Sequence, residues 1–271
     1  MLLHRVHRGP LYVAHLDHGW REESSAEADE LKKEVESLRI PFYSKRLECF
    51  GEGNWEEKAR LMRLAFLKEI YTKVGAMGLF MGHHADDRAE VVLKRLFEGA
   101  PFLRLGAFGE ETEMEGMRLL RPLIPFSKKK ITRWLEIEGV SYFQDPTNSD
   151  PRFLRGRMRA EMIPMLTKAF GKQIASNLCF LADEAESVRS YFHQINLPFI
   201  QEQGDKLLVD PALPALQVRY LIQQWLDRRG LFLSRDSLFA AVDLLLNKKN
   251  GELISGSINL KIKNGIIYIK D

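Results

Sequence analysis

The stretch Leu79-Phe-Met-Gly-His-His-Ala-Asp-Asp-Arg-Ala-Glu90 decides the fold that this sequence predicts. Residues 79–81 form a short apolar run that is typical of a buried strand, and Gly82 ends the run. The polar residues that follow open a predicted helix, so they lie at the carboxyl edge of a sheet, where open α/β sheets usually bind their ligands. A helix N-terminus also presents unpaired N–H groups and the positive end of the helix dipole, which suit a phosphate.

Two carboxylates of this stretch share one face of the predicted helix, because Asp87 and Glu90 are three residues apart. Paired oxygens in that position suit Mg²⁺ held together with phosphate oxygens. The competing interpretation is a capped helix start whose acidic residues are solvated. We favour a functional site, since two histidines and two aspartates directly follow the predicted strand.

Alternating strand and helix patterns surround this stretch. Strands are expected at residues 11–14, 42–47 and 117–120, and an amphipathic helix is expected at residues 22–38. The order strand, helix, strand, helix implies a parallel sheet with helices on its faces. The first half of the chain is therefore predicted to be an α/β domain.

A second helix of this domain is expected at residues 55–73, where Asn54 and Glu57 form a capping box. Glu57, Arg60 and Arg63 repeat at intervals of three on its charged face, which by itself favours a salt-bridged exposed surface over a site. The opposite stripe is predicted to be buried and consists of Ala59, Met62, Phe66 and Ile70.

A polar segment follows the strand predicted at residues 11–14. Histidine, aspartate and glycine at a strand end suit a loop that contacts a nucleotide. Because turns that contain histidine and glycine are common, this segment alone is a weak indication. Its candidate residues are His15, Asp17, His18, Gly19 and Arg21.

A basic cluster lies at residues 152–159, where four arginines are interleaved with Phe153 and Met158. Guanidinium groups match phosphates geometrically, so the pattern favours contact with an RNA backbone. The alternative is a solubilising basic patch. The four arginines are Arg152, Arg155, Arg157 and Arg159.

The second half of the chain is predicted to be mostly helical. Ser127 caps a basic helix that ends before Gly139. Residues 167–195 are expected to form one long amphipathic helix, which suits a connector between two domains. Shorter helices are expected around residues 216–225 and 238–246.

The chain closes with a predicted β-hairpin. Apolar residues alternate along residues 258–262, Asn264-Gly265 supplies a two-residue turn, and residues 266–269 form the returning strand. Helices followed by a hairpin predict a small α+β domain at the C-terminus.

The composition excludes several classes of protein. Of the 271 residues, 45% are hydrophobic and 28% are charged, as in soluble globular proteins. No run approaches the roughly 18 apolar residues of a membrane span, and the basic start is no signal peptide. Cys49 and Cys179 are read as unpaired thiols of a cytoplasmic chain. The net charge of +3 is too small to imply nucleic acid by itself.

Six segments resemble, in their order and approximate spacing, the motif series of the tRNA(Ile)-lysidine synthetase family of N-type ATP pyrophosphatases. Any one of these motifs is weak, but six in order are a strong indication. Residues 214–230 and the final hairpin also look like the small C-terminal domain of the shorter family members. The six segments are His15-x-Asp-His-Gly-x-Arg21, Asn54-x-x-Glu-x-Ala-Arg60, Gly82-His-His-x-Asp-Asp87-x-x-Glu90, Arg121-Pro-Leu123, Asp145-Pro-x-Asn148 and Arg155-x-Arg-x-Arg159.

The resemblance implies a fold of three parts. Residues 1–165 would form a parallel-sheet PP-loop ATPase domain of the adenine-nucleotide alpha hydrolase type. Residues 166–199 would be a helical connector, and residues 200–271 a small α+β domain that helps to bind tRNA.

It also implies a reaction. ATP would adenylate the C2 oxygen of the wobble cytidine of a tRNA(Ile) with a CAU anticodon, and pyrophosphate would leave. An amino group of L-lysine would then attack C2, giving lysidine and AMP. The implied cofactors are ATP and Mg²⁺, and the implied partners are that tRNA and L-lysine. The sequence sets no oligomeric state, and a homodimer is compatible with it.

The family's functional residues carry over onto the matching positions. The catalytic group would contain Arg60, His83, Asp87 and Glu90, and the last two would also hold the metal ion. ATP would contact His15, Asp17, His18, Gly19, Arg21 and Gly82. The tRNA would be bound by Arg152, Arg155, Arg157 and Arg159.

The sequence departs from the family pattern in two respects. The family opens with a strand and the loop Ser-Gly-Gly-x-Asp-Ser, which cradles pyrophosphate, whereas residues 1–4 here look like the helix that follows that loop. Gly156 also stands where an asparagine is usual. Two alternatives are a cytidine thiolase, whose Cys-x-x-Cys cluster this sequence lacks, and a tRNA-binding paralogue without catalysis.

We therefore predict that the chain as written binds tRNA without lysine-dependent release of AMP. Loss of two charge-assisted hydrogen bonds to phosphate, at about 1.5–3 kcal/mol each, would weaken ATP binding more than about a hundredfold. A chain extended by the strand and loop should release AMP. Full activity of the short chain would contradict this prediction.

Overall fold

The computed structural model describes residues 2–17, 19, 23–47, 55–142, 153–196, 201–256 and 258–270. Its contacts divide the chain into two compact units. One unit comprises Met1–Met81, Glu113–Leu120 and Glu136–Asp145, and the other comprises Gly82–Thr112, Arg121–Leu135 and Pro146–Asp271. The domain boundaries expected near residues 165 and 199 remain predictions.

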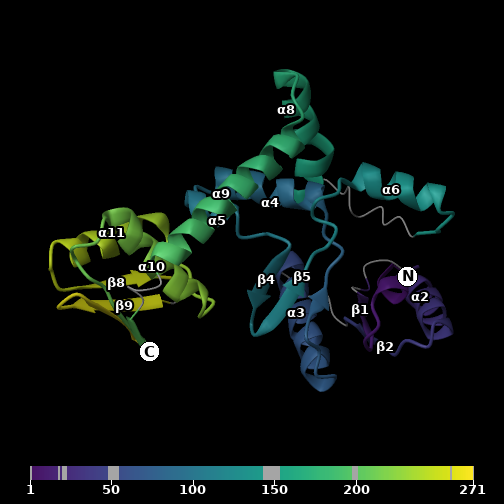
Figure 1. Ribbon diagram of the computed structural model, residues 1–271, viewed down its shortest axis with the longest axis horizontal. Helices are drawn as coiled ribbons and strands as arrows, with labels where there is room; N and C mark the ends of the chain where they lie inside the picture. The colour runs from purple at the N-terminus through teal and green to yellow at the C-terminus, as the bar shows by residue number, and fades with distance from the viewer. Residues whose placement is uncertain are drawn as a thin grey trace. The chain divides into compact units, whose positions relative to one another are not determined.

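The first unit begins with α1 (Leu2–Val6) and a parallel strand pair. Strand β1 (Val13–Asp17) pairs with β2 (Phe42–Arg46) in one continuous register, and α2 (Ser24–Ser37) connects the two strands (Figure 1). The predicted order of strand, helix and parallel strand is confirmed. Strand β1 starts and ends later than expected, so His15 and Asp17 lie within the strand and not after it.

Helix α3 (Trp55–Lys73) has the bounds that the sequence predicts. Three residues of its predicted stripe, Ala59, Phe66 and Ile70, are buried in a core that also contains Leu16 of β1. The predicted burial of Met62 is wrong, because 41% of this residue is exposed. At 3.6 residues per turn, a position three after Ala59 lies roughly 60° to one side of the stripe. The proposed cap residue Asn54 lies outside the described residues.

A second parallel pair follows in the sequence. Strand β3 (Leu79–Phe80) pairs with β5 (Met117–Leu120), as expected, and β5 is flanked on its other side by β4 (Glu111–Met114). The sequence did not predict β4, since its Glu-Thr-Glu-Met pattern has no apolar alternation strong enough to mark a strand. The observed parallel pairs confirm the predicted α/β class.

Helices form the first half of the second unit. Helix α9 (Ile174–Asn196) packs along α4 (Ala85–Phe97) and α5 (Phe102–Leu105), and Ala182 and Ala185 of α9 are completely buried (Figure 1). The basic helix α6 (Lys128–Ile137) starts at its predicted cap. Three consecutive helical segments precede α9, namely α7 (Leu154–Arg157), the π-helix η2 (Met158–Met162) and α8 (Ile163–Phe170).

The single long helix predicted at residues 167–195 is wrong. Helix α8 ends at Gly171, whose left-handed backbone (φ 60°) terminates the helix, and α9 begins at Ile174. The apolar residues continue with helical spacing across this break. Their periodicity therefore concealed a helix end that only the glycine marked.

The C-terminal part is an antiparallel sheet covered by two helices. Helices α10 (Ala215–Asp227) and α11 (Arg235–Leu246) share its apolar core, in which Trp225 and Leu245 are buried (Figure 1). The turn at Asn264 and Gly265 has positive φ at both residues, so the predicted hairpin is confirmed. In sheet order the strands are β6 (Gln201–Gln203), β7 (Lys206–Leu208), β10 (Ile266–Lys270), β9 (Ile258–Lys263) and β8 (Gly251–Ser255).

Among the described residues, no helix is both long and apolar enough to cross a membrane.

Gly106 allows α5 and α9 to approach closely. A Cβ atom at this position would lie 2.5 Å from the backbone nitrogen of Glu186. We expect Gly106→Ala to lower the free energy of unfolding by about 1–3 kcal/mol, because backbone must move to admit the methyl group. Urea unfolding measures this loss. Gly109→Ala is the matched control, since a Cβ there meets nothing within 4 Å; equal losses in both variants would contradict the close approach.

Candidate functional site

The predicted motif at residues 82–90 forms the start of α4. His84 is the N-cap residue, and its backbone N–H donates to Oδ2 of Asp87 at 2.9 Å. This hydrogen bond satisfies one of the donors that a helix start leaves free. Asp87 therefore fixes the position at which the helix begins.

A carboxylate–guanidinium clamp joins this helix start to the basic cluster. In the clamp, made of Asp87, Glu90 and Arg159, Nε of Arg159 donates to Oε1 of Glu90 at 2.7 Å. Nη2 of Arg159 donates to Oδ1 of Asp87 at 3.0 Å. Only 2% of the Glu90 side chain is exposed, so the ion pair is largely shielded from solvent.

Burial dominates the electrostatics of the clamp. It raises the pKa of Glu90, and the hydrogen bond and charge of Arg159 offset this effect only in part. Burial would lower the pKa of Arg159, but the hydrogen bond and charge of Glu90 outweigh it and raise that pKa. The guanidinium is therefore charged at every ordinary pH, and Glu90 depends on it for compensation.

The clamp bears on the predicted metal site. Oxygens of both Asp87 and Glu90 are engaged by Arg159, so a cation already stands between the two carboxylates. The described residues contain no group of three or more histidine, cysteine, aspartate or glutamate side chains placed to hold a metal ion. This arrangement does not fit a magnesium site built from protein ligands alone.

Further contacts of the motif hold α4 against its neighbours. Oδ2 of Asp86 accepts a hydrogen bond from the backbone N–H of Lys128 at 2.7 Å, which caps α6. The nearly buried Arg88 pairs with Asp183 of α9 at 2.5 Å. These polar residues of the motif therefore fix the helix in place.

Cys179 of α9 donates from its Sγ to the carbonyl oxygen of Ala85 at 3.2 Å. Burial raises the pKa of its thiol, which is therefore protonated and unreactive near neutral pH.

The basic cluster has an inner and an outer side. Arg155 of α7 is exposed, whereas Arg159 of η2 points into the clamp. A π-helical turn contains an extra residue and so changes which side chains face the neighbouring helix. Arg157 is partly buried, and Arg152 lies outside the described residues. The contacts of Arg159 thus differ from the RNA contact that the sequence predicted.

His83 and Gly82 lie just before α4. The His83 ring meets the ring of Phe108 edge-on at 5.1 Å between centroids, and the guanidinium of Arg121 lies 4.4 Å from that same ring. Gly82 is exposed. Aromatic packing therefore orients the histidine that the sequence placed in the catalytic group.

The first unit contains a second polar strand end, at Asp17. This residue is 7% exposed, and its Oδ1 accepts a hydrogen bond from the backbone N–H of Gly19 at 2.8 Å. Its Oδ2 lies 3.5 Å from Nε of Arg46 on β2. His15 stacks on Phe42 within the strands, while His18 and Arg21 lie outside the described residues.

Burial would raise the pKa of Asp17, but the hydrogen bonds from Gly19 and Ser24 and the charge of Arg46 together lower it. A lowered pKa in the folded state means that Asp17 stabilises the unit above the pKa of the unfolded chain. This stabilisation is lost as the pH falls through the folded pKa. Asp17 is thus a structural anion of the strand end.

Comparison with known proteins decides the family. A model of the PP-loop domain matches residues 1–166. The tRNA(Ile)-lysidine synthase of Chlamydia pneumoniae is 36% identical over 273 residues, which cover 97% of this chain and 83% of that protein. The protein of the same name from Chlamydia muridarum is 34% identical over 97% of this chain and 83% of its own length. This chain belongs to the tRNA(Ile)-lysidine synthase family.

A solved structure supports the fold. A U34-tRNA thiolase from Methanococcus maripaludis matches with a TM-score of 0.51, covering 66% of this chain and 61% of the thiolase. At 17% sequence identity this likeness shows a shared fold alone. The tRNA(Ile)-lysidine synthase family member described here therefore has the α/β fold that its sequence predicts.

Membership of the tRNA(Ile)-lysidine synthase family does not by itself assign the site residues. Arg60 is exposed on α3 of the first unit. In the same unit, His15 and Gly19 are partly buried and Asp17 is buried. The clamp, His83 and Gly82 belong to the second unit. A single centre made from both groups remains a prediction.

Sequence reasoning missed three residues that hold this site of the tRNA(Ile)-lysidine synthase family member. Asp183 and Cys179 lie on a helix without a recognisable motif, so no local pattern signalled them. Arg88 lies inside the motif, but its burial was not expected. Its position one helical turn before Val92 on the apolar face was the available signal.

We expect Arg159→Ala to lower the free energy of unfolding at pH 7 by about 3–5 kcal/mol, because it leaves Glu90 buried without its guanidinium. The folded pKa of Glu90 would then rise further above the value in the unfolded chain. The folded state would bind a proton more readily, so the loss should shrink from pH 7 to pH 5. Urea unfolding at both pH values measures this change.

Arg133→Ala is the control, since it removes an exposed arginine of α6 and keeps the clamp. Its stability should stay within about 0.5 kcal/mol of the parent chain. A loss for Arg159→Ala that is the same at both pH values would show that Glu90 is not the group left uncompensated.

Proposed function

We propose that this chain is a tRNA-modifying ligase that converts the wobble cytidine of a tRNA(Ile) with a CAU anticodon to lysidine. In the first step the C2 oxygen of the base attacks the α-phosphorus of ATP, and pyrophosphate leaves. In the second step an amino group of L-lysine attacks C2 and loses a proton. The C2 oxygen departs with AMP.

One observation carries the proposal beyond family membership. The clamp connects the strand-end motif, where open α/β sheets bind ligands, with the basic cluster that suits RNA phosphates. Bound RNA would contact Arg155 on the outer side of the cluster. Arg159 on its inner side would transmit the position of this segment to the start of α4. The clamp thus supports a site that aligns an RNA base with a nucleotide.

The residues of the chain contribute alignment and charge in this proposal. Holding base, ATP and lysine in a reactive geometry removes much of the entropy that their encounter would cost. The developing negative charge on phosphate requires fixed positive groups nearby. Arg60 and His83 are the candidates for contact with the reacting groups, and Asp17 for ordering the loop at the nucleotide.

Mg²⁺ would enter with ATP, because this ion keeps phosphate oxygens and water as most of its ligands. Asp87 and Glu90 would act on it mainly through the charge of the clamp. In this proposal Asp87 and Glu90 therefore bind Arg159 and do not coordinate the metal ion directly.

The test is lysine-dependent release of AMP in the presence of a tRNA(Ile) transcript with a CAU anticodon. It should be run with the chain and with a form preceded by a Ser-Gly-Gly-x-Asp-Ser strand and loop. We expect Asp87→Asn to lower AMP release of the active form by about 10- to 100-fold, as is typical when an orienting partner is lost. The affinity for the transcript should change little.

Asp243→Asn is the control, because this carboxylate is exposed on α11 and accepts a hydrogen bond from Asn247, which caps the same helix. AMP release that does not require lysine or the CAU anticodon in either form would refute the proposed reaction. Unchanged turnover of Asp87→Asn would remove Asp87 from the mechanism while leaving the reaction in place.

A further inference from the structure

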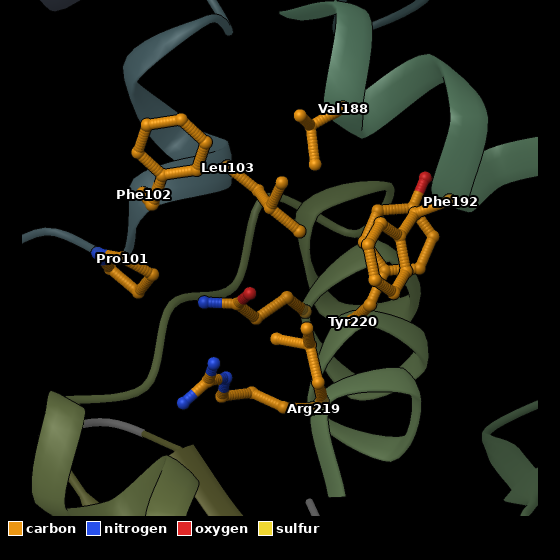
Figure 2. Close-up of a pocket in the computed structure, with 9 residues that line it drawn as sticks. Pro101, Phe102, Leu103, Val188, Phe192, Arg219 and Tyr220 are labelled. Carbon is orange, nitrogen blue, oxygen red and sulfur yellow. The ribbon is translucent and has the colours of Figure 1, made fainter. Parts of the chain in front are cut away.

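A hollow in the second unit lies between α5, α9 and α10. Its volume is about 90 Å³, and it is open to solvent. Figure 2 shows the ring of Phe102 on one side of it and the guanidinium of Arg219 on another. This hollow is separate from the clamp and from the six motif segments, although α10 lies in residues 214–230, which also resemble the family.

The walls of the hollow are mostly aromatic and aliphatic. Phe102 is 45% exposed and Leu216 is 43% exposed, although both are large apolar side chains. On the inner wall Phe192 packs on Tyr220 with 5.7 Å between ring centroids (Figure 2). The hydroxyl of Tyr220 is engaged with the backbone oxygen of Arg189, so the ring presents an apolar surface here.

Among the described residues, no hydrogen bond or ion pair engages two polar groups at the hollow, the amide of Gln223 and the guanidinium of Arg219. In the part of the chain that the structure describes, no carboxylate pairs with Arg219, which stacks over the ring of Phe239 at 5.1 Å. No acidic residue lines the hollow. Its charge is therefore positive, which favours an anionic ligand.

A nucleotide matches the aromatic walls, the amide and the guanidinium of the hollow. Its base is a flat ring with a hydrogen-bonding edge, and it carries a phosphate. Bases that are not paired stack on aromatic side chains and on arginine, and amides read their edges. A guanidinium binds phosphate in a fork geometry. An aliphatic helix would fill the apolar walls but would leave Arg219 and Gln223 without partners, which costs free energy.

We infer that this hollow binds one unstacked nucleotide of the RNA substrate. The base stacks on Phe102, its edge meets Gln223, and its phosphate meets Arg219. A further arginine–phenylalanine pair, Arg104 over Phe232 at 4.4 Å, adds aromatic surface next to α5, while Asp227 pairs with this arginine at 3.1 Å. The inference rests on the proposed function for the identity of the RNA, and it assigns to this surface a part in binding only.

The test uses the full chain and a fluorescently labelled tRNA(Ile) transcript at fixed salt concentration. Phe102→Ala should raise the Kd by about fivefold to a hundredfold, the range for loss of one stacked base. Phe102→Trp should restore binding to within about threefold, since indole stacks at least as well. Its new emission should be quenched by the transcript. Phe180→Ala is the matched control, being an exposed phenylalanine of α9 outside the hollow.

Arg219→Ala should also weaken binding and flatten its dependence on salt, because one phosphate contact is lost. Arg235→Ala, which removes an exposed arginine that contacts Asp236, should do neither. An unchanged Kd in Phe102→Ala, or an equal change in Phe180→Ala, would overturn the inference. Circular dichroism would show whether Phe102→Ala loses its fold. In that case the Kd values of Phe102→Trp and Arg219→Ala for the transcript test the inference.

Other occupants give distinct results. Quenching of Phe102→Trp by free CMP but not by the transcript would mean a mononucleotide site and would overturn binding of RNA. A dimer in light scattering that Phe102→Ala abolishes, with unchanged affinity for tRNA, would mean that a second copy covers the hollow. Absence of lysine-dependent AMP release with intact tRNA binding would refute the proposed reaction and leave this inference standing.

Discussion

The second unit depends on the charge of one guanidinium. Arg159 compensates the charge of Glu90, which is almost completely shielded from water. It also donates to Asp87, whose carboxylate accepts a hydrogen bond from the backbone N–H of the N-cap residue of α4. Without that charge, the helix start and the buried carboxylate would each lose a partner. Burial raises the pKa of Glu90 despite this pair, and replacement of a buried ion pair by apolar residues of similar volume is often neutral or stabilising. The polar clamp is therefore better explained by orientation than by stability.

Close packing makes this orientation effective. Ala182 and Ala185 of α9 and Gly106 after α5 have small or absent side chains, so the helix backbones approach one another closely. The pair between Arg88 and Asp183 then fixes α4 along α9. A shift of the basic segment would move Arg159, and through it the start of α4. Close packing thus holds Arg159 in a fixed position relative to residues 82–90.

Features set by neighbouring residues could be predicted from the sequence. The bounds of α3 follow from a local apolar period, and the turn at Asn264-Gly265 follows from the backbone freedom of those two residues. The clamp could not be predicted in this way, because Glu90 and Arg159 are separated by 69 residues. Each residue belongs to a recognisable motif, but their pairing depends on how α4 and η2 pack against each other. The family resemblance assigned Glu90 to the catalytic and metal-binding group and Arg159 to the residues that bind tRNA.

The basic segment shows why a charge pattern alone leaves its role open. Arg155 and Arg159 are four residues apart and would share one face of a regular α-helix, which is the basis for reading them as one RNA-binding row. The chain is π-helical over Met158–Met162, and the two arginines differ in exposure. One arginine faces solvent and the other a buried carboxylate. Arginines that share one charge pattern therefore have different surroundings, one exposed to solvent and one engaged in the clamp.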